Sequence, residues 1–144
     1  MCKVNPRKKT WEFKTKGRTL SQLYGHLEHG LVLPLALLTH KQYKKLTYPD
    51  FDGFFAILQS DTLVVRSSYS KEDKTGASLA GMFSSVLHVN GVSELRKAIE
   101  TVFSSYPEGI DEQEEVLIQP MAKGIKHCGV IFTKEPSSSA PYYV

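Results

Sequence analysis

The sequence has little cysteine and no apolar run long enough to cross a membrane. Its 144 residues include two cysteines, Cys2 and Cys128, which lie far apart in the chain. Neither a disulfide framework nor a zinc-binding spacing can be built from them, which favours a reducing, cytoplasmic location. The apolar run 31–38 is interrupted by Pro34 and is far shorter than the roughly 20 residues of a membrane span. No apolar stretch follows the basic N-terminus, so a secretory signal is not expected.

Several common catalytic arrangements are also missing. The sequence contains no recognisable Ser-His-Asp set, no paired-carboxylate site and no Gly-x-x-x-x-Gly-Lys phosphate loop. Its histidines are His26, His29, His40, His88 and His127. We interpret them as surface or structural residues.

Charge is distributed unevenly although the formal net charge is only +3. Residues 1–18 are strongly basic and contain a single acid, Glu12, whereas residues 108–115 are acidic and contain no base. A basic arm is one way to bind nucleic acid, but no nucleic-acid-binding motif follows it. We therefore expect no nucleic acid or membrane partner, and we interpret the acidic run as a solvated linker.

The hydrophobic content of 41% and the charged content of 23% are those of an ordinary globular protein of one domain. Apolar spacing predicts helices over 19–27, 39–46, 51–58 and 93–105, and strands or extended segments over 31–38, 62–66, 84–89, 116–119 and 129–132. Thr39 and Ser93 are the expected helix caps, and Gly124 is expected to ease a hairpin turn between the last two strands. Because helices and strands do not alternate regularly, the predicted fold class is α+β.

The segment 63–81 is the most informative part of the chain. Arg66 is expected at the end of a buried strand, followed by two serines and a polar loop that carries Gly76, Ser78 and Gly81. A guanidinium beside hydroxyls and a glycine-bearing loop can hold a polyphosphate through charge-assisted hydrogen bonds. The structural alternative is a strand-end arginine paired with Glu72 or Asp73. The two readings are compatible, because a carboxylate can orient the guanidinium in an empty site.

This segment resembles the arginine-serine-serine and glycine-alanine-serine signature of the ATP/AMP-binding domain of the phosphoenolpyruvate synthase and pyruvate phosphate dikinase family. Three further segments resemble that family in the same order, and together the matches span roughly residues 14–136. They are Thr15-Lys16-Gly17-Arg18-Thr19-Leu20, Leu31-Val32-Leu33-Pro34, and the pair 116–121 and 129–136. The resemblance implies a partial nucleotide-binding domain of the ATP-grasp type over 14–144, made of its N-terminal subdomain and the start of the next, preceded by a lead-in segment over 1–13.

The resemblance implies two cationic phosphate ligands, Lys16 and Arg66, covered by the loop with Gly76, Ser78 and Gly81. Without it, Lys16 would be read as one surface lysine among many. The chain also departs from the family here, with Thr15 in place of a glycine and Arg18-Thr19 in place of alanine-asparagine.

Gln119, Pro120 and Met121 resemble the strand against which adenine packs. There a backbone N–H and C=O pair reads the edge of the base, and a methionine supplies a polarizable apolar wall. The alternative for Met121 is ordinary core packing.

The family also sets expectations about the parts that would complete a reaction. Its members pass phosphate from ATP, with Mg²⁺, through a carrier histidine in a separate downstream domain to an acceptor such as pyruvate. The metal ligands are expected beyond Val144, so the sequence predicts a truncated ATP-binding portion of a kinase that is inactive in isolation. The alternative is a non-catalytic nucleotide-binding or interaction remnant of the same fold.

Overall fold

The computed structural model describes residues 12–71 and 83–129. Four strands form one antiparallel sheet in the order β1-β4-β2-β3. The strands are β1 (Ala36–Thr39), β2 (Leu63–Ser68), β3 (Ser85–Val89) and β4 (Glu115–Pro120). Helices and an antiparallel sheet are thus mixed, which confirms the predicted α+β class. Within the described ranges, no helix is long and apolar enough to cross a membrane.

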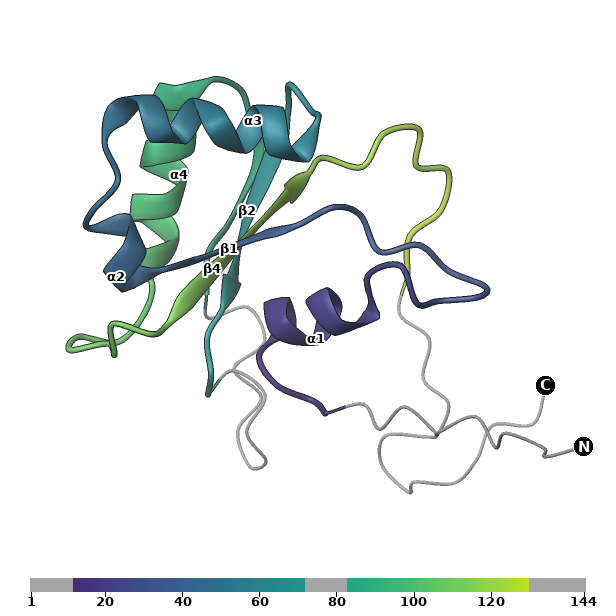
Figure 1. The fold of residues 1–144 in the computed structure, drawn as a ribbon, viewed down its shortest axis with the longest axis horizontal. Helices are drawn as coiled ribbons and strands as arrows, with labels where there is room; N and C mark the ends of the chain where they lie inside the picture. Colours follow the sequence, from purple (N-terminus) through teal and green to yellow (C-terminus); the bar gives the residue numbers. More distant parts are fainter. Residues whose placement is uncertain (1–11, 72–82, 130–144) are drawn as a thin grey trace, which may run out of the picture.

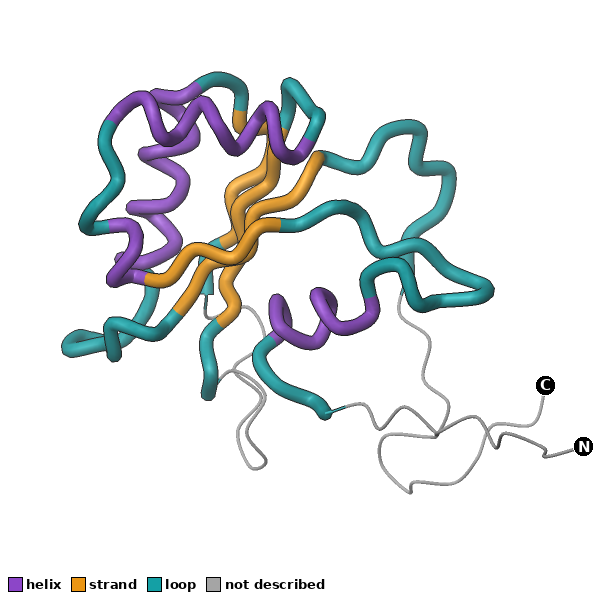
Figure 2. The backbone as a smooth tube through the Cα atoms, viewed as in Figure 1, coloured by secondary structure: helices purple, strands orange, loops and turns teal. Residues whose placement is uncertain are grey.

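Helices lie on both faces of the sheet (Figure 1). Three α-helices, α2 (His40–Tyr43), α3 (Asp52–Leu58) and α4 (Val92–Ser104), cover one face, and α1 (Lys16–Leu23) lies on the other. Figure 2 shows the same arrangement, with the strands running between the two groups of helices. A short 3-10 helix, η1 (Tyr48–Phe51), leads into α3.

The hydrophobic core lies between the sheet and α4. Side chains of α4 at helical spacing are buried, as the sequence predicted: Leu95, Ala98, Ile99, Val102 and Phe103. They pack against alternate residues of the strands, among them Val65 of β2 and Ile118 of β4. The aromatic Phe51 and the aliphatic Leu58 join the same core.

The two predicted helix caps have different outcomes. Thr39 caps α2 as expected, since its hydroxyl accepts the Gln42 N–H and the Gln42 side chain accepts the Thr39 N–H. Ser93 does not cap α4 and lies inside its first turn. The cap is Gly91, whose φ of 79° belongs to the left-handed region that glycine adopts without strain.

Helix α1 begins and ends earlier than predicted. The expected helix covered 19–27, but the Thr15 hydroxyl accepts the Arg18 N–H and starts the helix at Lys16. It ends at Leu23, before Gly25 with its φ of 72°. The earlier start places Lys16 and Gly17 in the first turn of α1, and Gly17 is buried there against the sheet.

The expected hairpin after β4 is not formed by the described residues. Residues 121–129 contain no strand, although Gly124 has the positive φ of 66° expected for a turn. The predicted strand 129–132 lies outside the described residues from position 130 onward. The structure does not describe residues 1–11, 72–82 and 130–144.

Candidate functional site

The face of the sheet opposite α4 carries two of the predicted site residues, Arg66 and Gln119. Side chains alternate along a strand, so those adjacent to the core residues point to the other side. We call this side the α1 face; its residues are Leu37 of β1, Val64, Arg66 and Ser68 of β2, and Glu115, Leu117 and Gln119 of β4. The first turn of α1 packs on this face, which brings the segment of Lys16 to the strand of Arg66.

Arg66 lies within β2 and not at its end. The strand continues through Ser67 and Ser68 because these residues pair with Val116 and Glu115 of β4. Arg66 is opposite Leu117 and is exposed, whereas its neighbours in the strand are buried. The Arg66 guanidinium is therefore an exposed charged group in a strand whose other residues are buried. Its expected partners Glu72 and Asp73 lie outside the described residues.

Lys16 is the first residue of α1 and is half-buried. Next to it, the backbone N–H of Gly17 donates a hydrogen bond of 2.9 Å to Ser68 Oγ. Ser68 is two residues from Arg66 along β2 and on the same face. The structure thus brings the segments of Lys16 and Arg66 together, although 51 positions separate Gly17 from Ser68.

The expected adenine strand, β4, is the immediate neighbour of β2. Gln119 is buried opposite Val64, and its amide nitrogen lies 3.5 Å from the Leu33 carbonyl oxygen. The half-buried Met121 follows the strand, and its N–H donates to the Thr62 carbonyl at 2.8 Å. Because that N–H is already used, a backbone pair that reads adenine must use other residues.

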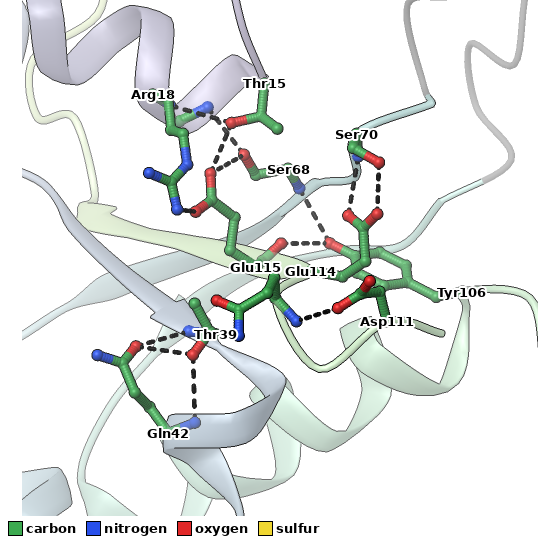
Figure 3. A network of polar contacts seen from close by, with 12 residues as sticks. Thr15, Arg18, Thr39, Gln42, Ser68, Ser70, Tyr106, Asp111, Glu114 and Glu115 are labelled. Carbon is green, nitrogen blue, oxygen red and sulfur yellow. Dashed lines mark hydrogen bonds and ion pairs between the residues drawn. The ribbon is translucent and has the colours of Figure 1, made fainter. Parts of the chain in front are cut away.

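The loop residues Gly76, Ser78 and Gly81 lie outside the described residues. At the start of that segment, Ser70 is fixed by the Glu114 carboxylate, which accepts hydrogen bonds from the Ser70 hydroxyl and, at 2.9 Å, from its N–H (Figure 3). Behind it, the Tyr106 hydroxyl bridges β2 and β4: it accepts the Ser68 N–H and donates to the Glu115 carbonyl. These contacts hold the strand end from which the predicted phosphate loop departs.

The interpretation of 108–115 as a solvated linker is wrong at its C-terminal end. Glu114 is 8% exposed and Glu115 is 1% exposed. Glu115 begins β4 and turns its carboxylate toward α1, where it accepts the Thr15 hydroxyl at 2.5 Å and the Ser68 hydroxyl at 3.3 Å (Figure 3). Arg18 Nη2 lies 3.0 Å from Glu115 Oε2 in an ion pair rather than a well-directed hydrogen bond. The sequence hinted at this role only through the position of Glu115 beside an apolar strand.

An open hollow of about 570 Å³ lies along α4 and is lined by Ser84, Lys97, Glu100, Thr101, Ser104 and Ser105. None of the predicted site residues lines this hollow. In the part of the chain that the structure describes, no group of three or more His, Cys, Asp or Glu side chains could hold a metal ion.

The family model described as "Pyruvate phosphate dikinase, AMP/ATP-binding domain" matches residues 51–143, which is more than half of the chain. The matched part contains β2, α4 and β4, and with them Arg66, Gln119 and Met121. Lys16 lies before it. No curated protein and no solved structure matches the chain.

Proposed function

The chain belongs to the pyruvate phosphate dikinase AMP/ATP-binding domain family, and from this premise we propose that it binds ATP on the α1 face of its sheet. Lys16 and Arg66 contact the phosphates, and the loop with Gly76, Ser78 and Gly81 covers them. Gln119 and Met121 lie beside the adenine. In this assignment the domain extends over residues 14–144 and has the ATP-grasp type of fold.

One observation carries the proposal. Arg66 and Gln119 come from segments far apart in the sequence, yet they lie on the same face of neighbouring strands, and α1 is docked on that face beside them. The Arg66 guanidinium on β2 offers several hydrogen-bond donors, whereas the Gln119 side-chain amide on β4 has apolar neighbours. The proposed site therefore has a charged end and a less polar end. That polarity matches a nucleotide, whose phosphates are charged and whose base is flat and mostly apolar.

For the reaction that follows ATP binding, we infer that the domain supplies ATP to a dikinase-type phosphotransferase, in which phosphate passes through a histidine to an acceptor such as pyruvate. The described residues do not fit a magnesium site made by the protein, so we assign no residue of this chain to the metal. The scarcity of cysteine supports a cytoplasmic location.

Calorimetric titration of the whole chain tests the proposal. ATP and AMP, added with Mg²⁺ in the buffer, are expected to bind at one site and to compete with each other. GTP is the control, because the proposed adenine strand should discriminate against a guanine base. Absence of heat with ATP up to millimolar concentration would overturn the proposal and would favour an interaction module that has lost nucleotide binding.

A further inference from the structure

The most completely buried charged side chain of the described core lies between α1 and the sheet. Glu115 is 1% exposed, and every side-chain partner of its carboxylate lies in the segment that opens α1 or in β2. These partners are the hydroxyls of Thr15 and Ser68 and the guanidinium of Arg18 (Figure 3). The carboxylate thus joins three chain segments at one point: the start of α1, the end of β2 and the start of β4.

Close packing restricts the same turn of α1 from its other side. A Cβ atom on Gly17 would overlap Leu37 Cδ2 and would lie 2.9 Å from Ser68 Oγ. The backbone of α1 therefore approaches β1 and β2 as closely as only glycine permits. Glu115 also holds Thr15 and Arg18, and Ser68 accepts a hydrogen bond from the Gly17 N–H. These contacts restrict any shift of the turn that contains Lys16.

A buried carboxylate is a costly way to attach a helix by stability alone. Taking the charge out of water has a large desolvation cost, and an apolar contact of similar size often stabilises a fold equally well. What a buried polar network provides is one defined geometry, because each donor must meet its acceptor. Because Glu115 lies beside the first turn of α1, the network fixes the geometry of the turn that contains Lys16.

We propose that Glu115 is a positioning residue for ATP binding, which acts by holding the first turn of α1 so that Lys16 lies beside the strand of Arg66. This inference rests on the proposed function. Holding a cationic side chain in place before the ligand arrives lowers the ordering cost of binding. Glu115 itself does not contact the nucleotide, and Arg18 balances its charge.

Replacing Glu115 by glutamine separates positioning from simple electrostatics, since the two predict changes of opposite sign. If Glu115 acted only as a nearby negative charge, Glu115→Gln would strengthen the binding of the anionic ATP. If it positions α1, the loss of the Arg18 ion pair loosens the turn and ATP binds about fivefold more weakly or worse, the lower end of typical coupling between two sites. Titration calorimetry of the whole chain with ATP measures the difference.

A double-mutant cycle with Lys16→Ala tests the route of the effect. If Glu115 acts through Lys16, Glu115→Gln weakens ATP binding in the native background and has no further effect in the Lys16→Ala protein. An unchanged or tighter affinity of Glu115→Gln, or a full effect in both backgrounds, would overturn the inference. Should Glu115→Gln fail to fold, Ser68→Ala replaces it in the same cycle, because it removes the bridge between Glu115 and Gly17 without leaving a charge unpaired.

Two controls separate the positioning role of Glu115 from ATP binding itself and from a general loss of stability. Val102→Ala creates a cavity on the other face of the sheet, lowers the melting temperature and should leave ATP affinity unchanged; an equal loss of affinity would overturn the positioning role. Hydrogen exchange of the ligand-free protein should be faster at the amides of Gly17 and Thr19 in Glu115→Gln than in the native protein, and equal rates would overturn it too. If the native protein does not bind ATP at all, the proposed function falls, and the positioning role falls with it.

Discussion

The backbone N–H of Gly17 and the side-chain oxygen of Ser68 form a hydrogen bond of 2.9 Å that ties α1 to the central sheet. No Cβ atom separates the helix from the strand at this point, so the two backbones approach closely. Ser68 lies on the same strand and the same face as Arg66, and Gly17 directly follows Lys16. The bond therefore brings the segment of Lys16 to the strand of Arg66.

Gly17→Ala is expected to destabilise the fold by about 1–3 kcal/mol, as overpacking does in a close-packed region. The new methyl group overlaps Leu37 Cδ2 and presses on Ser68 Oγ, so α1 must move away from the sheet. Gly53→Ala is the matched control: Gly53 lies in α3 with nothing within 4 Å of an added Cβ, and the change should stabilise by about 0.5–1 kcal/mol. Urea unfolding of the two variants measures both values, and an equal response of the two would show that α1 is not closely docked.

Arg66→Ala is expected to weaken ATP binding by about 1.5–3 kcal/mol, the range for a hydrogen bond to a charged group. Adenosine, which has no phosphate, should bind the variant and the native protein equally. Because Arg66 is exposed on its strand, the free energy of unfolding should change little. Arg96→Ala, on α4 and on the far side of the sheet, is the control that removes an exposed arginine elsewhere. Equal ATP affinity of Arg66→Ala and the native protein would assign Arg66 a structural role.

Stability is expected to fall as the pH is lowered through the titration of His40. Burial, and secondarily the positive charge of Lys44, lowers the pKa of His40 below its ordinary value of 6.5, with Glu112 opposing the change. The unfolded chain therefore takes up the proton more readily than the folded one. The stabilisation is present above pH 6.5 and is lost as the pH falls toward the lowered pKa of the folded state.

Urea midpoints measured at about pH 7.5 and about pH 5.5 test this dependence. The native protein should lose more stability between the two values than His40→Gln does. The comparison isolates His40, since it is the residue in which the two proteins differ. Equal slopes would show that the imidazole is as accessible to protons in the fold as in the unfolded chain.

The sequence predicted the fold best where the local apolar spacing matches the burial of side chains in the structure. The apolar spacing in α4 predicted its buried face, and the α+β class followed from the mixture of elements. The cap of α4 was predicted wrongly because Ser93 has the residue type of a cap, whereas the chain uses the positive φ of Gly91 to turn into the helix. A residue type alone does not show where the backbone turns.

The site was less accessible from sequence than the core. Arg66 was found from its local motif, but its place in the middle of β2 depends on pairing with Val116 and Glu115, which are distant in sequence. Glu115 was missed for the same reason. In sequence it ends an acidic run that looks solvated, and only the docking of α1 buries it and supplies Arg18 as its partner. The acidic composition describes most of the run correctly and fails at Glu114 and Glu115, where tertiary contacts bury the side chains.

Mapping of backbone amide chemical shifts during a titration with ATP tests the central claim most directly. The largest changes are expected on the α1 face and its flanks: at Lys16 and Gly17 in α1, at Arg66 in β2, and at Gln119 and Met121 in and after β4. Residues of the hollow along α4, such as Lys97 and Thr101, should change little. Changes concentrated along α4, or none with ATP at millimolar concentration, would contradict the claim that this face of the sheet binds the nucleotide.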